Sequence, residues 1–316
     1  MDIITLGETM VLFTPNKSGM LRNMDQFSAQ VGGSESNVAI GLVRLGHKVG
    51  WISRLGNDEF GWKIYQSLRG EGIDLSQVQF DGDFQTGIYF KEMLNSEEVR
   101  VQYYRSNSAA TQLQPSDLNE QYIASAKYLH ITGITPLLSE SCYETIMKAI
   151  EIARENNVTV VFDPNIRKTL KGSREIKKVL LEIASKSDIV LPGKSEGEYL
   201  TGETTPERMA KYFHGNGASI VIIKLGENGA YYSVGDSDGY IAAYPVKQMV
   251  DPVGAGDGFA AGVLSGLLDG LPVVESVQRG TVLGSLVTMV QGDIEGLPDR
   301  ERLERINKES REDVLR

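Results

Sequence analysis

One short stretch near the end of the chain combines residues that bind anions with a carboxylic acid. Residues 251–262 read D-P-V-G-A-G-D-G-F-A-A-G, a turn of small residues that leads into an apolar helical pattern. Glycine lets consecutive backbone N–H groups point toward one spot, and the N-terminus of a helix adds the positive end of its dipole. The stretch therefore predicts a phosphate-sized anion hole formed by the backbone of Gly254, Ala255, Gly256 and Asp257.

The acid in this stretch has two possible roles. A carboxylate in the first turn of a helix often serves only as a cap or as a favourable charge. Beside a phosphate site, however, a carboxylate can accept a proton from an attacking hydroxyl group. The stretch alone leaves both roles open for Asp257.

A second glycine-rich stretch lies near the start of the chain. Residues 32–39 read G-G-S-E-S-N-V-A and lead into another helical pattern. A ligand can approach the backbone closely at Gly33, and the amide of Asn37 can both donate and accept hydrogen bonds with sugar hydroxyls. The alternative is a plain turn from strand to helix with a capping asparagine.

The elements that would position these residues alternate in type along the chain. Short apolar runs predict buried strands at 3–6, 49–53, 128–131, 158–162, 189–191 and 220–223. Apolar residues at helical spacing predict helices through Val38, Leu42 and Leu45, through Phe60, Ile64 and Leu68, and through Phe259, Val263 and Leu267. Such alternation is typical of βαβ units, so we expect an α/β fold with a mainly parallel sheet.

One region departs from this alternation. Residues 86–92 and 99–105 are alternating runs joined through Asn95 and Ser96, which predicts a β-hairpin. We expect this hairpin, together with a strand at 9–15, to form a lid. An edge hairpin without a function is the alternative.

Composition and charge narrow the class of protein. The chain has 316 residues, of which 41% are hydrophobic and 23% are charged, as in an ordinary globular protein. The net charge of −10 argues against binding to nucleic acid or to an anionic membrane. The single cysteine, Cys142, excludes an intrachain disulfide, so we expect a reducing compartment, the cytoplasm.

Together the two glycine-rich stretches resemble the ribokinase-like (phosphofructokinase-B type) family of carbohydrate kinases. The resemblance runs from Ile3 to about Pro298. It implies a three-layer α/β/α fold with a mainly parallel central sheet and a small β lid. It also implies that residues 1–316 form a single kinase domain, with the lid built from about 9–15 and 86–105.

Three further segments refine the resemblance. Residues 101–110, V-Q-Y-Y-R-S-N-S-A-A, are similar to the Y-Y-R-x-x-S-A-A segment of 2-keto-3-deoxygluconate kinases, and 163–167, D-P-N-I-R, to their D-x-N-x-R segment. Asp251-Pro252-Val253 favours the same branch. A sugar acid carries a carboxylate, with which Arg105 and Arg167 could pair, although either arginine could instead be an ordinary surface cation.

The resemblance implies a reaction and a set of roles. The reaction is ATP-dependent phosphorylation of the terminal hydroxyl of 2-keto-3-deoxygluconate, with Asp257 as general base and the 254–257 backbone as anion hole. The implied sugar-binding residues are Gly33, Asn37, Tyr89, Tyr103, Arg105, Arg167 and Asp257. The implied nucleotide-binding residues are Asn165, Arg167, Lys224, Gly226, Gly229, Gly254 and Gly256.

The resemblance also implies a metal ion and an assembly. Mg²⁺ is expected to arrive with ATP, and Glu196 to support it indirectly through water. Gly193 stands where the family often has asparagine, a departure that puts that contact in doubt. The apolar hairpin predicts a homo-oligomer assembled through the lid. Fructokinase or ribokinase activity is the alternative within the family, and an inactive nucleotide-binding regulator is the alternative outside it.

Overall fold

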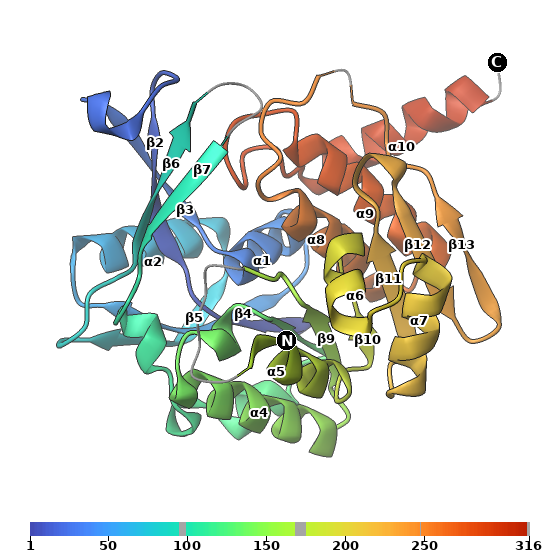
Figure 1. Cartoon of the computed structure of the whole chain (residues 1–316), viewed down its shortest axis with the longest axis horizontal. Helices are drawn as coiled ribbons and strands as arrows, with labels where there is room; N and C mark the ends of the chain where they lie inside the picture. Colours follow the sequence, from blue (N-terminus) through green and yellow to red (C-terminus); the bar gives the residue numbers. More distant parts are fainter. Residues whose placement is uncertain (95–98, 168–174, 247, 315–316) are drawn as a thin grey trace.

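The computed structural model describes residues 1–94, 99–167, 175–246 and 248–314 and is built around a nine-stranded sheet (Figure 1). Its strands follow the order β13-β12-β11-β10-β9-β8-β1-β4-β5. Their bounds are β1 (Ile3–Leu6), β4 (Val49–Gly56), β5 (Asp74–Asp81), β8 (Tyr128–Thr132), β9 (Thr159–Asp163), β10 (Ile189–Val190), β11 (Ile220–Lys224), β12 (Ala230–Val234) and β13 (Ser237–Ile241). All neighbours from β5 to β11 are parallel, and β12 and β13 add an antiparallel edge.

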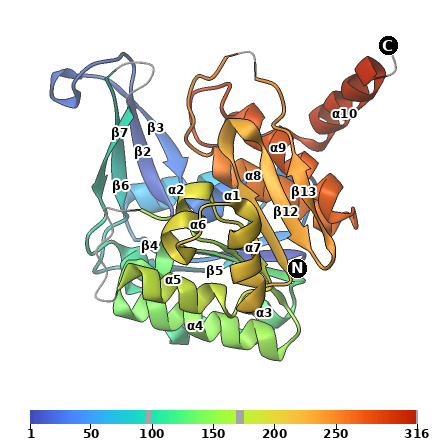
Figure 2. The same cartoon turned by 45° about the vertical axis from the view of Figure 1, so that its right-hand side comes forward.

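The central strands are apolar on both faces, so each face is covered by helices. Along β1, Ile3 belongs to one buried cluster and Ile4 to the other. The first cluster lies beneath α1 (Ser34–Arg44), α2 (Glu59–Glu71), α8 (Ala255–Leu268), α9 (Val273–Val287) and α10 (Arg300–Val314). The second lies beneath α3 (Glu120–Ala124), α4 (Glu140–Glu155), α5 (Ile176–Ala184), α6 (Lys194–Thr201) and α7 (Pro206–Gly215). Figure 2 shows both helical layers, and the predicted three-layer α/β/α fold is confirmed.

The sequence predicted the parallel strands better than the edges. All six predicted strands are present, as β1, β4, β8, β9, β10 and β11. Sequence analysis missed β5 at one edge and the β12–β13 hairpin at the other. Short 3₁₀ helices at Leu21–Asn23, Ala109–Gln112, Pro115–Asp117, Thr135–Leu137 and Gly226–Asn228 complete the described elements.

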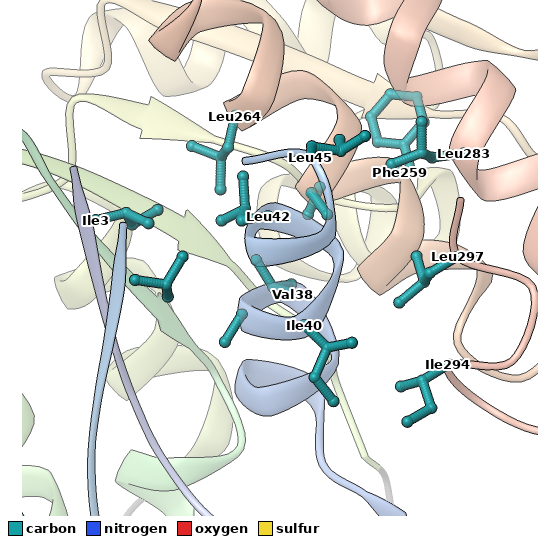
Figure 3. Close-up of a cluster of buried hydrophobic side chains, with 14 of the residues drawn as sticks. Ile3, Val38, Ile40, Leu42, Leu45, Phe259, Leu264, Leu283, Ile294 and Leu297 are labelled. Atoms are coloured by element: carbon teal, nitrogen blue, oxygen red, sulfur yellow. The ribbon is translucent and has the colours of Figure 1, made fainter. Parts of the chain in front are cut away.

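Helices α1 and α8 pack against each other, and this contact brings their N-termini together. Figure 3 shows Val38 and Leu42 of α1 in the same cluster as Phe259 and Leu264 of α8. The helices are close because α1 carries Gly41, where a Cβ atom would lie 2.8 Å from the Cβ of Ala261. Both glycine-rich stretches therefore meet at one end of this helix pair.

A second, four-stranded sheet, which we call the lid, stands up from the main sheet (Figure 1). It contains β2 (Met10–Pro15), β3 (Phe27–Gly32), β6 (Ile88–Met93) and β7 (Val99–Tyr104), in the order β3-β2-β6-β7. Strands β6 and β7 pair antiparallel, although the predicted turn at Asn95 and Ser96 lies outside the described residues. Strand β3 was not predicted, although Phe27, Ala29 and Val31 alternate with the polar residues Ser28 and Gln30.

The two faces of the lid differ. Its inner face carries Met10, Leu12 and Tyr89, which form a small buried cluster with Tyr103 against them. Its outer face carries stacked and edge-on aromatic rings, namely Phe13, Phe27, Phe90 and Tyr104. Within the described residues, we find no helix whose length and apolar character would allow it to span a membrane.

Candidate active site

The carboxylate of Asp257 lies at the N-terminus of α8 and is only 7% exposed. Gly254 caps this helix with a φ of +83°, a conformation that favours glycine. A side chain would not fit there in any case, because a Cβ atom would lie 2.5 Å from the backbone oxygen of Asp293. The first backbone N–H groups of a helix have no intrahelical partner, so this turn can bind an anion.

Two segments supply hydrogen-bond donors to the Asp257 cluster. From α1, the Ser34 hydroxyl donates to Oδ1 at 2.6 Å and the Asn37 amide donates to Oδ2 at 2.8 Å. From the segment after β9, the Asn165 amide donates to Ser34 Oγ at 2.6 Å and more weakly to Asp257 Oδ1 at 3.4 Å. Asn165, predicted to contact the nucleotide, thus joins the predicted base to the predicted sugar-binding helix.

Burial raises the pKa of Asp257 to about 6, while the hydrogen bonds from Ser34 and Asn37 lower it. The carboxylate is consequently charged at neutral pH, yet it is a stronger base than an exposed aspartate. This combination suits a group that must accept a proton at neutral pH.

A partly buried ion pair lies next to this cluster. Lys224 Nζ is 2.6 Å from Oδ2 of Asp163, whose other oxygen accepts the Asn165 N–H at 3.2 Å. Burial lowers the pKa of Lys224, but the charges of Asp163 and Glu196 outweigh it, and the net shift is upward. The ammonium therefore remains charged at the mouth of the anion hole.

A polar cavity of about 750 Å³ opens beside Asp257. It is lined by Asn165, Arg167, Gly193, Lys194, Ser195, Glu196, Glu198, Lys224, Leu225, Gly226, Pro252, Val253, Gly254, Gly256 and Asp257. Most of the predicted nucleotide-binding residues thus line one cavity. Arg167 is one of them, and its side chain is exposed.

A second cavity, of about 650 Å³, shares Lys224, Gly226, Pro252 and Gly256 with the first. Its other walls are mainly apolar and include Gly229, Tyr244, Pro245, Val246, Met249 and Phe259. The two cavities together form a site that is polar at the Asp257 end and apolar at the other. Such a site suits a ligand with an anionic chain and a flat, apolar ring system.

Glu196 lies in the first turn of α6 and reaches the polar cavity. Its Oε2 accepts the Gly193 N–H at 2.6 Å, and its Oε1 accepts the Ile166 N–H at 2.7 Å. The glycine that replaces the expected asparagine therefore binds Glu196 through its backbone. Within the described residues, no three His, Cys, Asp or Glu side chains are grouped as a metal site.

Of the predicted sugar-binding residues, Arg167 and Asp257 line the polar cavity, whereas the other five line neither cavity, namely Gly33, Asn37, Tyr89, Tyr103 and Arg105. The Gly33 N–H donates weakly to Asn37 Oδ1 at 3.4 Å, next to Asp257. On the lid, the rings of Tyr89 and Tyr103 stack with centroids 5.6 Å apart. Tyr89 approaches the first glycine pair closely, because a Cβ at Gly32 would lie 2.2 Å from its hydroxyl.

Arg105 is buried and already paired. It forms an ion pair with Glu8, and its guanidinium lies 5.4 Å from the centre of the Tyr103 ring. Within the described part of the chain, its Nε has no hydrogen-bond partner. Arg105 is therefore no free surface cation, but it retains a buried donor for an acceptor such as a carboxylate.

Several residues of this site were not predicted from the sequence. Ser34 and Glu35 lie inside the glycine-rich stretch and could have been singled out there. Burial raises the pKa of Glu35 to about 7, although its Oε1 accepts hydrogen bonds from Thr132 and Thr135. Asp163 likewise belongs to a recognised segment without having been assigned a role.

Comparisons with known proteins agree with this geometry. A family model described as pfkB family carbohydrate kinase matches residues 1–300. The 2-dehydro-3-deoxygluconokinase of Bacillus subtilis (strain 168) is 43% identical over 305 residues, 96% of this chain and 94% of that protein.

Solved structures match as well. The PfkB protein from Polaromonas sp. JS666 has a TM-score of 0.89 and 41% identity, covering 96% of this chain and 99% of that one. A structure named for Ribokinase II of E. coli, in complex with ATP and Mg²⁺, has a TM-score of 0.91 and 27% identity, covering 98% and 99%. Because the matches span nearly whole chains, the likeness includes the lid as well as the main sheet.

Proposed function

The chain belongs to the pfkB family of carbohydrate kinases, and from this premise we propose that it phosphorylates the terminal hydroxyl of 2-keto-3-deoxygluconate with ATP. The observation that carries the substrate is the 43% identity to a 2-dehydro-3-deoxygluconokinase over 96% of the chain. The buried carboxylate of Asp257 at an anion hole supports catalysis rather than a regulatory role without activity.

ATP fits the two joined cavities in one orientation. The apolar cavity beside Phe259 suits the adenine ring, and the polar cavity beside Lys224 suits the phosphates. In this orientation the nucleotide would contact Lys224, Gly226, Gly229, Gly254 and Gly256. Asn165 and Arg167 lie where the phosphate chain approaches Asp257.

Mg²⁺ fits this site only as a partner of the nucleotide. Both oxygens of Glu196 accept backbone N–H groups, and each keeps a lone pair for a water molecule. When bound with ATP, Mg²⁺ neutralises phosphate charge during transfer. The protein itself supplies Glu196 to orient water around the ion.

Asp257 acts as general base in the proposed transfer. It takes the proton of the terminal hydroxyl as that oxygen forms a bond to the γ-phosphorus, and the bond to the bridging oxygen of ADP breaks. Ser34 and Asn37 hold the carboxylate by one hydrogen bond to each oxygen. The N–H groups of the Gly254–Asp257 turn bind the equatorial phosphoryl oxygens as negative charge develops there.

The sugar acid would bind between Asp257 and the inner face of the lid. Asn37 and the backbone at Gly33 are placed for its hydroxyls, and Tyr89 and Tyr103 offer a stacked apolar wall. The free Nε donor of Arg105 suits the substrate carboxylate, with Glu8 holding the rest of the guanidinium. Arg167, exposed in the polar cavity, serves the transferred phosphoryl group or the carboxylate.

We further propose that the lid excludes water from the reaction and pairs with the lid of a second copy. The aromatic outer face includes Tyr104, which is 57% exposed, and Phe60 of α2 packs beside Phe13. An exposed patch of aromatic rings of this kind is typical of a protein–protein interface. The free, buried Cys142 fits a reducing compartment, which supports a cytoplasmic location.

The proposed function is tested by a coupled assay for ADP release with 2-keto-3-deoxygluconate, fructose and ribose. The phosphorylated product is identified by ³¹P and ¹³C NMR. A phosphate ester on the terminal carbon of the keto acid is the expected product. Transfer to fructose or ribose alone would leave the family assignment and contradict the substrate.

A further inference from the structure

Lys91 is a fully buried cation on the inner face of the lid. It follows Tyr89 by two residues on β6, so both side chains point to the same side. The side chain is 1% exposed. Its Nζ lies 3.0 Å from Oδ2 of Asp251 and 2.7 Å from Oδ1 of Asp293.

The two carboxylates belong to the two segments that shape the anion hole. Asp251 opens the glycine-rich stretch, and its Oδ1 accepts the Val253 N–H at 3.0 Å. The backbone of Asp293 packs against Gly254, the cap of α8, where it leaves no room for a side chain. One ammonium therefore joins the lid to both walls of the phosphate site.

This arrangement is costly to build, which points to a role beyond stability. Burying an ammonium and two carboxylates removes all three from water, and apolar side chains of similar size could fill the space more cheaply. Burial lowers the pKa of Lys91, but Asp293 and Asp251 outweigh this effect and the net shift is upward, so the ammonium remains charged.

Tyr89 extends the link to the proposed sugar site. Its hydroxyl donates to Oδ2 of Asp293 at 3.0 Å, while Lys91 holds the other oxygen of the same carboxylate. A sugar bound against Tyr89 would therefore be connected to Gly254 through two side chains and one backbone contact.

We propose that Lys91 is a positioning residue for phosphoryl transfer, whose ammonium fixes the anion-hole segment relative to the lid. It touches neither reactant and acts through Asp251 and Asp293. The inference rests on the kinase reaction of the family, and any sugar that the protein phosphorylates serves to test it.

The test is chemical rescue of the Lys91→Ala variant. Misplacing the anion hole by about 1 Å should lower kcat by about 100-fold. The KM for ATP should change by less than about threefold, because Lys91 does not line either nucleotide cavity. Ammonium or ethylammonium chloride should enter the vacated carboxylate pocket and restore kcat at least about tenfold. Tetramethylammonium chloride, too large for the pocket, controls for ionic strength.

Two further variants distinguish a loss of positioning from a loss of folding. Lys148→Ala removes an exposed lysine from α4 and should change neither kcat nor its response to ammonium. The double variant Lys91→Met/Asp293→Asn keeps the local net charge of the cluster at −1 and can fold even where Lys91→Ala does not. A folded double variant with low kcat supports the proposal.

Three results would overturn it. They are wild-type kcat in folded Lys91→Ala, a loss of kcat that neither ammonium ion relieves in a folded variant, and wild-type kcat in the double variant. The sugar is whichever the wild type phosphorylates fastest, so a wrong substrate would contradict the proposed function without affecting this test.

Discussion

Asn37 and Asp257 are 220 residues apart in the sequence, yet the Asn37 amide donates a 2.8 Å hydrogen bond to the Asp257 carboxylate. The contact joins the first turn of α1 to the first turn of α8. It holds the proposed sugar-binding amide directly against the proposed base.

Replacing Asp257 with asparagine should abolish most turnover without unfolding the protein. Asparagine keeps the size of the side chain but cannot accept the proton, and losing a general base costs roughly 10²–10⁴-fold in rate. Steady-state kcat, ATP affinity and thermal unfolding would be measured. The matched control is Asp236→Asn in the exposed β12–β13 turn. A variant that keeps more than about a third of wild-type kcat would show that Asp257 is not the base.

The rate should fall in acid as Asp257 becomes protonated. Because its pKa is raised to about 6, kcat/KM should decline below that pH with a slope of one proton. The Ser34 hydroxyl stabilises the charged form of Asp257. Ser34→Ala should therefore shift the midpoint of this acid decline to a higher pH by about one unit. Ser36→Ala, which removes a nearby hydroxyl that donates to the Gly33 carbonyl, should leave the midpoint unchanged. An unchanged midpoint in Ser34→Ala would contradict the assignment of the acid decline to Asp257.

Glu35 should make the protein less stable as the pH rises. Burial raises its pKa from 4.5 to about 7, so the folded state holds a proton that the unfolded chain releases. Below pH 4.5 Glu35 is protonated in both states, and the protein keeps the whole of its stability. As the pH rises through 7, the free energy of unfolding falls by up to roughly 3 kcal/mol because of this group. Urea unfolding of Glu35→Gln should lack this decline relative to wild type, whereas Glu304→Gln on α10 should retain it. Parallel stability curves for wild type and Glu35→Gln would refute the prediction.

The outer face of the lid should form a dimer interface. Tyr104→Lys places a charge among the aromatic rings and should convert the dimer to a monomer at micromolar concentration. Tyr240→Lys, at an equally exposed tyrosine on β13, should not. Light scattering distinguishes the two states. A wild-type monomer at this concentration would contradict the proposal.

The sequence predicted the inner strands and the helix pair α1–α8 well, for a physical reason. Strands buried on both faces, such as β1 and β9, are continuous apolar runs, and helices such as α8 keep an apolar period. Strand β3 was missed because it has no continuous apolar run, and its alternation of Phe27, Ala29 and Val31 with Ser28 and Gln30 is short.

Contacts between segments that are distant in the sequence were also not predicted. Lys91 meets Asp251 and Asp293 across 160 and 202 residues, and no local pattern predicts such a cluster. Asn37 and Asp257 were both predicted as site residues from the two glycine-rich stretches. The direct contact between these two side chains, however, depends on the packing of α1 against α8. The ion pair between Glu8 and Arg105 could likewise not be predicted, because Glu8 follows a different strand.

Substrate preference should depend on Arg105. Arg105→Lys keeps a positive charge for Glu8 but removes the planar donor set, including the free Nε. A charge-assisted hydrogen bond is worth roughly 1.5–3 kcal/mol, so kcat/KM for the keto acid should fall about 10- to 150-fold. The value for fructose, which has no carboxylate, should change less than about threefold. An equal loss for both sugars would assign Arg105 to the lid or the phosphate instead.

The most direct test of the proposed function is the ratio of kcat/KM for 2-keto-3-deoxygluconate to that for fructose in the wild-type protein. A buried arginine donor beside the stacked pair Tyr89 and Tyr103 should favour the sugar acid by at least about tenfold. We therefore predict a ratio above 10. A ratio of one or less, or a higher value for ribose than for the keto acid, would contradict the substrate that we propose.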